Sequence, residues 1–272
     1  MSDSPILGVE LIAPQSLTSD QIAQVHDADY VRAVQTGVPS GLAESQGFEW
    51  DAGLWRMVAS SNGGVVAAAL AALESGVAGS LSSGLHHAKR GRGAAFCTFN
   101  GLVIAAREAL LAGAASVLIL DLDAHCGGGT ASLIADEPRI WQLDVAVDSF
   151  DGYTSGQRAR LRLVTDGDEY LAEIEKCLTD ILRAAPQFTL CIYNAGMDPF
   201  EGCATGGLPG ITREMLAARE RLVFTVCREA GVAVAFVLAG GYLGAHLDED
   251  ALVGLHRLTL SAAVDSQGRT LD

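Results

Sequence analysis

Four short runs of apolar residues recur along the chain, at 116–123, 139–147, 188–196 and 232–239. Such nearly continuous runs are typical of strands that are buried on both faces of a parallel sheet. The segments 168–185 and 212–231 have helical periodicity, and the second begins at a Thr and ends at a Gly, which are common helix boundaries. This alternation predicts an α/β fold with three α/β/α layers and a central, mostly parallel sheet.

The 272 residues fit one large α/β domain, and no repeat, low-complexity tract or linker divides them, so we expect a single domain over 1–272. No uninterrupted apolar run has membrane-spanning length, and the N-terminal residues do not read as a secretion signal. Six cysteines without a CxxC pair indicate reduced thiols. We therefore expect a cytoplasmic protein.

The formal net charge is −15. It disfavours nucleic acid and anionic membranes as partners, and it favours cationic ligands such as lysine side chains or polyamines.

Polar residues cluster directly after the first run, in DLDAHCGGG at 121–129. Asp121, Asp123 and His125 alternate along the chain, so extended backbone places their side chains on one side. Such a set can give a carboxylate and an imidazole to zinc while the remaining Asp orients a neighbour. The alternative is a helix-capping Asp beside an ordinary polar His. Three polar residues after an apolar strand favour the metal hypothesis.

Asp198 follows the third run, in NAGMDPFEG. Asp-Pro alone indicates an ordinary turn. Its place at the end of another core strand makes Asp198 a candidate third ligand. A metal with three protein ligands and one open position is suited to hydrolysis, because it lowers the pKa of a water in that position.

Two further segments contain candidate catalytic side chains. His86 and His87 are adjacent in a glycine-rich loop, and although a lone loop His is usually a surface group, a pair favours acid–base work. In AGGYLG at 239–244, Gly240 and Gly241 leave the Tyr242 hydroxyl free to face a cavity. A Tyr that simply packs over the loop is an equally good reading of this segment.

Together, and in this order, four motifs resemble the histone-deacetylase and acetylpolyamine-amidohydrolase family, with its arginase/deacetylase fold. The motifs are GLHHAKRGRGAAFCTFN, LILDLDAHCGGGT, NAGMDPFEG and LAGGYL, and the similarity extends over roughly residues 10 to 262. Four ordered motifs are far more specific than one.

The resemblance implies a mononuclear zinc or iron site and an activity on linear acyl amides of a lysine side chain, a polyamine or a similar amine, in a small molecule or a peptide. It implies His87 as general base and then acid, with His86 beside it supported by Asp121. It also implies Tyr242 as donor to the acyl oxygen, with Gly240 and Gly241 beside it, Phe96 as a channel wall, and a monovalent cation such as K⁺ near Asp121. The implied metal ligands are Asp123, His125 and Asp198.

One position departs from the family pattern. The family has an acidic or amide residue where this chain has Gly128, and that residue normally orients the second histidine. His87 therefore loses its usual partner, which leaves open a reduced activity, an altered substrate or a substitute carboxylate elsewhere. Cys126, beside a ligand, is expected to be a packing residue.

The sequence leaves other readings in competition. A binuclear, arginase-like site is disfavoured because Gly127 stands where a further Asp is needed. A degenerate protein that binds acylated amines without hydrolysis remains the alternative to an enzyme. In the segment 38–53 neither Glu44 nor Asp51 is assigned as a substrate-gripping acid, which implies a shallow rim or one completed by a second subunit in a homo-oligomer.

Overall fold

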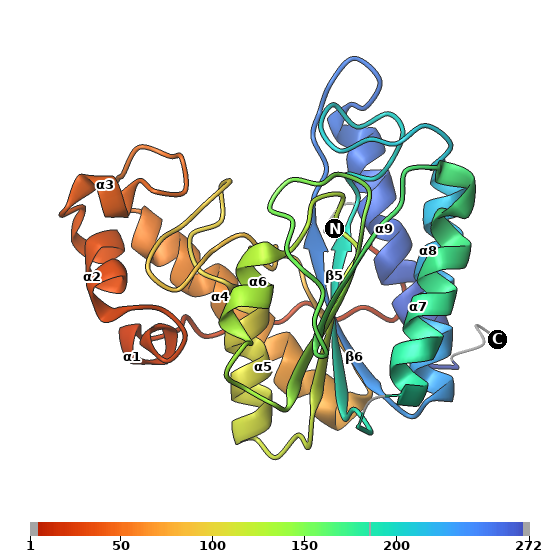
Figure 1. Ribbon diagram of the computed structural model, residues 1–272, viewed down its shortest axis with the longest axis horizontal. Helices are drawn as coiled ribbons and strands as arrows, with labels where there is room; N and C mark the ends of the chain where they lie inside the picture. Colours follow the sequence, from red (N-terminus) through yellow and green to blue (C-terminus); the bar gives the residue numbers. More distant parts are fainter. Residues whose placement is uncertain (1–4, 185, 269–272) are drawn as a thin grey trace.

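A parallel sheet forms the centre of the structure (Figure 1), a computed structural model that describes residues 5–184 and 186–268. Within those residues six strands pair in the order β1-β6-β5-β2-β3-β4, and every pair is parallel. Their bounds are β1 Val77–Ser80, β2 Val117–Asp121, β3 Ile140–Ala146, β4 Ala159–Leu163, β5 Leu190–Gly196 and β6 Ala233–Ala239.

The central strands are mostly apolar because each one faces two hydrophobic cores. In β2, Val117 and Ile119 join a core with α4 and α5, whereas Leu118 and Leu120 join a core with α7, α8 and α9. Alternate residues of a strand point to opposite faces, so a strand between two helical layers needs apolar residues at every position.

The helices form the two outer layers, with α7, α8 and α9 on one face and α4, α5 and α6 toward the other, while α1, α2 and α3 extend to the side (Figure 1). A short 3₁₀ turn, Gly167–Glu169, precedes α7. The helix bounds are α1 Ser19–Ala23, α2 Ala28–Thr36, α3 Ser40–Ala43, α4 Leu54–Ser75, α5 Gly101–Leu111, α6 Gly128–Leu133, α7 Tyr170–Ala184, α8 Arg213–Glu229 and α9 Glu249–Ser266.

The predicted three-layer α/β fold is confirmed. The four apolar runs are β2, β3, β5 and β6, and the two periodic segments are α7 and α8. Residue 185, the last of the expected helix 168–185, and residues 1–4 of the N-terminal segment lie outside the described residues.

The two edge strands were not predicted. β1 has only four residues, and β4 alternates Arg160 and Arg162 with apolar residues; one of these arginines, Arg162, pairs with Glu173 of α7.

Among the described helices, α4 is long and apolar enough to cross a membrane, by length and composition alone. Its most apolar window is 56% buried inside the protein, where α4 packs against α5, β1 and β6. The apolar residues of α4 are therefore those of a core helix.

A buried ion pair lies beneath the carboxyl ends of β2 and β5. Arg219 and Glu220, adjacent on α8, are fully buried, and an Arg219 nitrogen lies 2.7 Å from a Glu220 carboxylate oxygen. Arg219 also donates to the Leu122 carbonyl and the Tyr170 hydroxyl, and the Tyr193 hydroxyl donates to Glu220. This network fixes α8 to the loop that follows β2.

We expect Arg219→Met to lower the free energy of unfolding by about 3–5 kcal/mol, because it leaves the Glu220 charge buried without its partner. Urea denaturation measures the change. Arg221→Met, at an exposed position of the same helix, is the control and should stay within about 0.5 kcal/mol of the parent. Equal stability of the two variants would contradict a structural role for the pair.

Candidate active site

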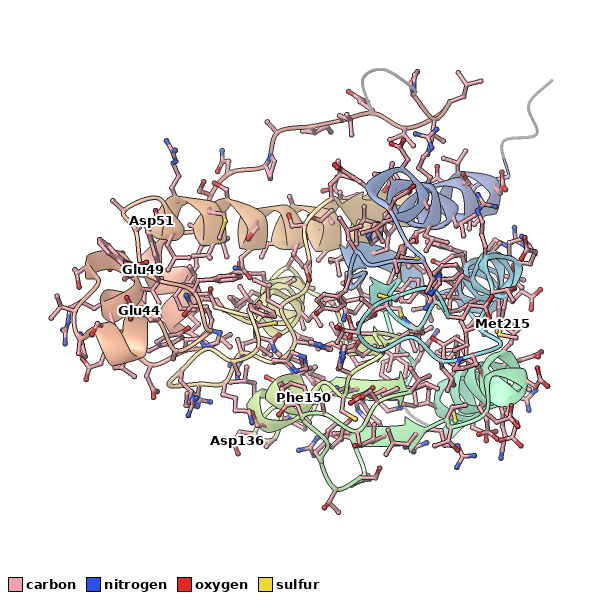
Figure 2. The ribbon with its side chains drawn as sticks, turned by 90° about the horizontal axis from the view of Figure 1, so that it is seen from above. Glu44, Glu49, Asp51, Asp136, Phe150 and Met215 are labelled. Carbon is pink, nitrogen blue, oxygen red and sulfur yellow. The ribbon has the colours of Figure 1, made fainter. Side chains whose placement is uncertain are left out.

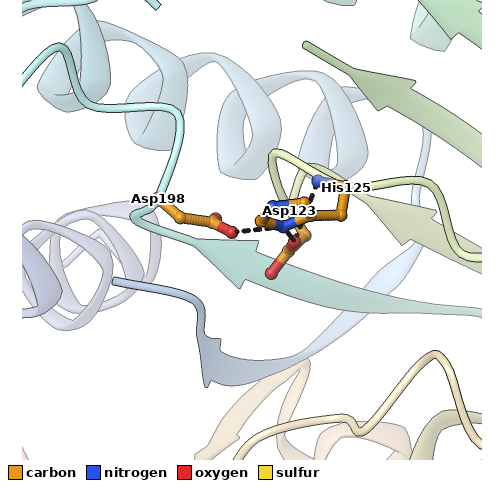
Figure 3. A group of neighbouring side chains, drawn as sticks. All are labelled: Asp123, His125 and Asp198. Atoms are coloured by element: carbon orange, nitrogen blue, oxygen red, sulfur yellow. Dashed lines mark hydrogen bonds and ion pairs between the residues drawn. The ribbon is translucent and has the colours of Figure 1, made fainter. Parts of the chain in front are cut away.

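Three side chains that could hold a metal ion meet where β2 and β5 end (Figure 3). Asp123 and His125 lie in the loop after β2, and Asp198 lies two residues beyond β5. β2 and β5 are neighbours in the sheet, so their carboxyl ends bring these loops together. One ligand atom of each residue lies within 4.8 Å of the others, and all three residues are buried.

Backbone amides and the histidine ring orient the two carboxylates. The Ala124 N–H donates to Asp198 Oδ1 at 3.1 Å, and the His125 N–H donates to Asp123 Oδ1 at 3.0 Å. His125 Nδ1 lies 3.1 Å from Asp123 Oδ1 and 3.0 Å from Asp198 Oδ2. The contact of Asp198 Oδ2 with His125 is an ion pair without hydrogen-bond geometry, so this buried oxygen keeps a lone pair that a metal ion could use.

The charges of this cluster favour a bound cation. Burial and the neighbouring Asp123 raise the pKa of Asp198 to about 7. Burial opposes the charged form of His125, but its contacts with both carboxylates raise its pKa to about 10. Two buried carboxylates side by side repel each other, and here one proton or one imidazolium charge offsets that repulsion only in part. A bound divalent ion would remove it. Two oxygens and one nitrogen with an open side fit a hydrolytic zinc or iron site.

The histidine pair lies beside this cluster. His86 Nδ1 donates to Asp121 Oδ2 at 2.7 Å, and His86 Nε2 lies 3.0 Å from His87 Nε2. Burial opposes the charge of His86, yet Asp121 and Asp123 outweigh it and raise its pKa well above the usual value. Burial lowers the pKa of His87, so the two shifts favour a positive charge on His86 over one on His87.

His87 does not lack a partner. Its Nδ1 lies 3.0 Å from Asp151 Oδ2, a carboxylate of the loop between β3 and β4. Gly128 had left open a reduced activity, an altered substrate or a substitute carboxylate elsewhere in the chain. The structure contains the substitute carboxylate, Asp151. The sequence motif gave no signal for it, because Asp151 is 64 residues from His87 along the chain.

The remaining predicted residues line a cavity of about 260 Å³ with the histidines. The Tyr242 ring lies 6.1 Å from the His125 ring, measured between centroids. Gly240 has φ +57°, and a Cβ there would overlap Asp198 Oδ1, so only glycine allows the chain to pass so close to a ligand. The lining includes Asp123, Phe96, Gly240, Gly241 and Tyr242.

Phe96 is 55% exposed at this cavity, with its backbone N–H bonded to the Gln46 carbonyl. Phe150, which the sequence did not single out, packs edge-on against His87 and His125 at centroid distances of 5.1 and 6.1 Å. Two partly exposed aromatic rings therefore stand near the site, on loops from different parts of the chain.

His26 was also missed, although it fixes the loop that bears the histidine pair. It is buried, its Nδ1 donates to the Lys89 carbonyl at 2.9 Å, and its Nε2 accepts from the Asn100 N–H at 2.9 Å. Asn100 in turn caps α5 and donates to the His86 carbonyl. A single His in an N-terminal helix–turn segment has no local pattern that predicts such a role.

A buried oxygen near Asp121 fits the expected monovalent cation. Asp144 lies beside Asp121 in the sheet, and one of its oxygens accepts from the Gly127 N–H at 2.7 Å while the other, Oδ1, is buried without a hydrogen bond. Burial and Asp121 raise the pKa of Asp144 well above its usual value. A hard cation with oxygen ligands would relieve both.

The acids of the segment 38–53 lie apart from this centre. Glu44 accepts from the Trp50 N–H and Asp51 from the Gly53 N–H, so both stabilise local backbone. Figure 2 shows them with the exposed Glu49 at the end of the molecule formed by α3 and the start of α4, well away from Phe150.

Comparison with known proteins identifies the family. Residues 2–257 match the model of the histone deacetylase domain. The chain belongs to the histone deacetylase family. Family membership makes it a deacetylase-type amidohydrolase, with a metal centre expected at Asp123, His125 and Asp198.

Similar proteins occur in bacteria and plants. An uncharacterised protein of Picosynechococcus is 35% identical over 89% of this chain and 82% of its own length. Histone deacetylase 2 of Arabidopsis thaliana is 32% identical over 72% of this chain, and the acetoin utilization protein AcuC of Bacillus subtilis is 29% identical over 50%. The matched regions are 52% and 38% of those two proteins.

Two solved structures share the fold. The acetylpolyamine aminohydrolase of Burkholderia pseudomallei has a TM-score of 0.71 at 18% identity, over 94% of this chain and 84% of its own. The HDA15 HD domain has a TM-score of 0.72 at 19% identity, over 96% and 76%.

We expect the purified protein to bind about one divalent ion per chain, and Asp198→Ala to lose it, because Asp198 offers an otherwise unused buried oxygen. Elemental analysis after dialysis against zinc measures the content. Asp180→Ala, on the exposed side of α7, is the control. Full metal content in Asp198→Ala would remove that residue from the ligand set.

We expect His26 to make stability depend on pH. Burial lowers its pKa from 6.5 to about 4, so between these values the unfolded chain binds a proton that the folded chain does not. The free energy of unfolding must then fall as the pH drops through this window. His26→Gln should flatten that slope, and urea denaturation in chelator from pH 7 to 4.5 measures it. His256, whose pKa burial also lowers to about 4, keeps part of the slope. Identical slopes in parent and variant would contradict the assignment.

Proposed function

We propose that the protein is a metal-dependent deacetylase that hydrolyses the acyl amide of a lysine side chain, a polyamine or a similar amine. The observation that carries this proposal is that the Asp123-His125-Asp198 cluster reaches, through Asp123, the cavity that His86, His87 and Tyr242 line. Each part of a hydrolytic amidase is then within one site: a place for a metal, a proton carrier and a hydrogen-bond donor for the acyl oxygen.

Asp123, His125 and Asp198 would hold Zn²⁺, with Fe²⁺ as the alternative, and the oxygens near Asp121 and Asp144 would hold a monovalent cation such as K⁺. The divalent ion would supply Lewis-acid chemistry, which polarises an acyl oxygen and makes water more acidic. Asp123 and Asp198 keep their orientation through the amides of His125 and Ala124.

His87 is suited to move the proton. Because its Nδ1–H faces Asp151, the ring presents a neutral Nε2 that can take a proton from the attacking water. The same nitrogen then gives the proton to the departing amine, which leaves poorly as an anion. His86, held charged by Asp121, stabilises negative charge beside it.

Tyr242 is suited to bind the acyl oxygen. Burial and the nearby Asp123 raise the pKa of its hydroxyl, so it stays protonated and can donate a hydrogen bond as negative charge develops on that oxygen. Gly240 and Gly241 hold the backbone beside it in left-handed conformations.

The substrate is proposed from shape and charge. Phe96 and Phe150 are aromatic surfaces of the kind that pack along an aliphatic amine chain, and the net charge of −15 favours a cationic carrier. The resemblance in fold to an acetylpolyamine aminohydrolase supports a polyamine as one candidate and an acyl-lysine peptide as another.

The alternative of a degenerate, non-hydrolytic binder rested on the missing partner of His87. Asp151 occupies that place, and this contact supports hydrolysis over the alternative.

We expect the metal-loaded protein to deacylate an acetyl-lysine or acetyl-polyamine reporter, and His87→Ala and Tyr242→Phe each to lose at least ~100-fold in kcat, because they remove the proton carrier and the oxygen donor. Steady-state kinetics with metal analysis of each variant test this. Full activity in a variant would remove its residue from the mechanism, and metal-loaded protein without turnover on a panel of acylated amines would favour the binding alternative.

A further inference from the structure

Asp151 and Gly128 compete for one position beside His87. A Cβ added at Gly128 would overlap the Asp151 carbonyl oxygen and would lie 2.8 Å from Asp151 Oδ1. The space that a side chain at 128 would fill is therefore taken by the Asp151 residue. Gly128 is the first residue of α6, whereas Asp151 comes from the loop between β3 and β4.

We propose that Asp151 is the positioning residue of His87, and that the β3–β4 loop supplies the carboxylate that residue 128 does not. This inference rests on the proposed function, since it assigns the residue that orients its proton carrier. Asp151 acts through His87 and is given no contact with substrate.

Three contacts fix the carboxylate. Asp151 Oδ2 faces His87 Nδ1 at 3.0 Å and accepts from the Gly129 N–H at 3.1 Å. Asp151 Oδ1 lies 3.0 Å from Lys89 Nζ. The side chain is only 12% exposed. A carboxylate held at both oxygens cannot rotate freely, so it can set the tautomer and the plane of the imidazole ring.

The backbone conformation of Asp151 supports its role as the positioning residue of His87. Its φ is +55°, a left-handed conformation that costs energy for a residue with a Cβ but is tolerated better by Asp and Asn than by most. Gly152 follows directly and would fit such a conformation at no cost, yet the left-handed residue is the Asp. The preceding residue, Phe150, packs against the His87 ring, so two consecutive loop residues contact the imidazole: Phe150 through its ring and Asp151 at Nδ1.

The first test compares substitutions at Asp151 in the metal-loaded full chain. Asp151→Ala should lower kcat at least ~10-fold with little change in KM and full metal content. Asp151→Asn should recover most of that loss, because an amide oxygen still accepts a hydrogen bond from His87 Nδ1. Asp136→Asn is the matched control, an exposed carboxylate between α6 and β3 that is labelled in Figure 2.

A parental kcat in Asp151→Ala would overturn the proposal. So would a loss that follows lost metal or lost folded protein in equal measure, since the role would then be structural.

The second test moves the carboxylate. Asp151→Gly removes the side chain and suits the left-handed backbone, and its freer backbone lets the residue-151 carbonyl move away from a Cβ at 128. Gly128→Asp added to it then restores a carboxylate from α6. The double variant should exceed Asp151→Gly in kcat, whereas Gly128→Asp alone should be impaired because its Cβ meets Asp151. Impairments that simply add would show that the two positions do not share one role.

A third readout does not depend on turnover. In protein labelled with ¹⁵N-histidine and loaded with zinc, the His87 Nδ1–H should give a protected resonance, assigned by its loss in His87→Ala. It should vanish in Asp151→Ala and persist in Asp151→Asn and Asp136→Asn. A protein without deacylase activity that keeps this pattern would fail the proposed function alone, and an active protein whose resonance ignores Asp151 would fail this inference alone.

Discussion

The hydrogen bonds of Asp121 hold the active site together. This carboxylate, fully buried at the end of β2, accepts from His86 through one oxygen, and through the other from the Asn194 side chain and the Asp123 N–H. Its partners come from the histidine loop, from β5 and from the metal-ligand loop. A buried carboxylate that accepts from three donors is fixed in place and orients each donor. The placement of the histidine pair relative to Asp123 therefore depends on a residue outside the Asp123-His125-Asp198 cluster.

The same edge of the sheet concentrates negative charge. Asp121, Asp123, Asp144 and Asp198 are all buried there, and burial together with the neighbouring carboxylates raises the pKa of Asp144 and of Asp198, so these two carboxyls resist ionisation without a bound cation. Arg219, beneath them, is already paired with Glu220. Burial of an unpaired carboxylate costs several kcal/mol, so this arrangement lowers the free energy of unfolding unless bound cations offset the cost. Metal binding and stability are consequently linked in this protein.

Much of this was accessible from sequence because the relevant signals are local. The strands at 116–123 and 188–196 are apolar on both faces, and polar residues directly after them can only lie at the carboxyl edge of the sheet. Neighbouring strand ends then bring Asp123, His125 and Asp198 within reach of one another. The edge strand β4 escaped prediction because it has five residues and lacks the continuous apolar run of the central strands. His26 escaped because its partners, Lys89 and Asn100, are more than sixty residues away.

The partner of His87 shows why a motif can mislead at a single position. A motif records which residue usually supplies a group, whereas the chemistry requires only that the group be present in a given place and orientation. Here the place beside His87 is reached from two directions, by α6 and by the β3–β4 loop, and the two residues exclude one another sterically. Glycine at 128 is thus a condition for Asp151 to enter, because the smaller residue creates the space that the carboxylate fills. In the sequence, Gly128 looks like the loss of the carboxylate that orients His87. In the structure, that carboxylate comes from the β3–β4 loop instead, as Asp151.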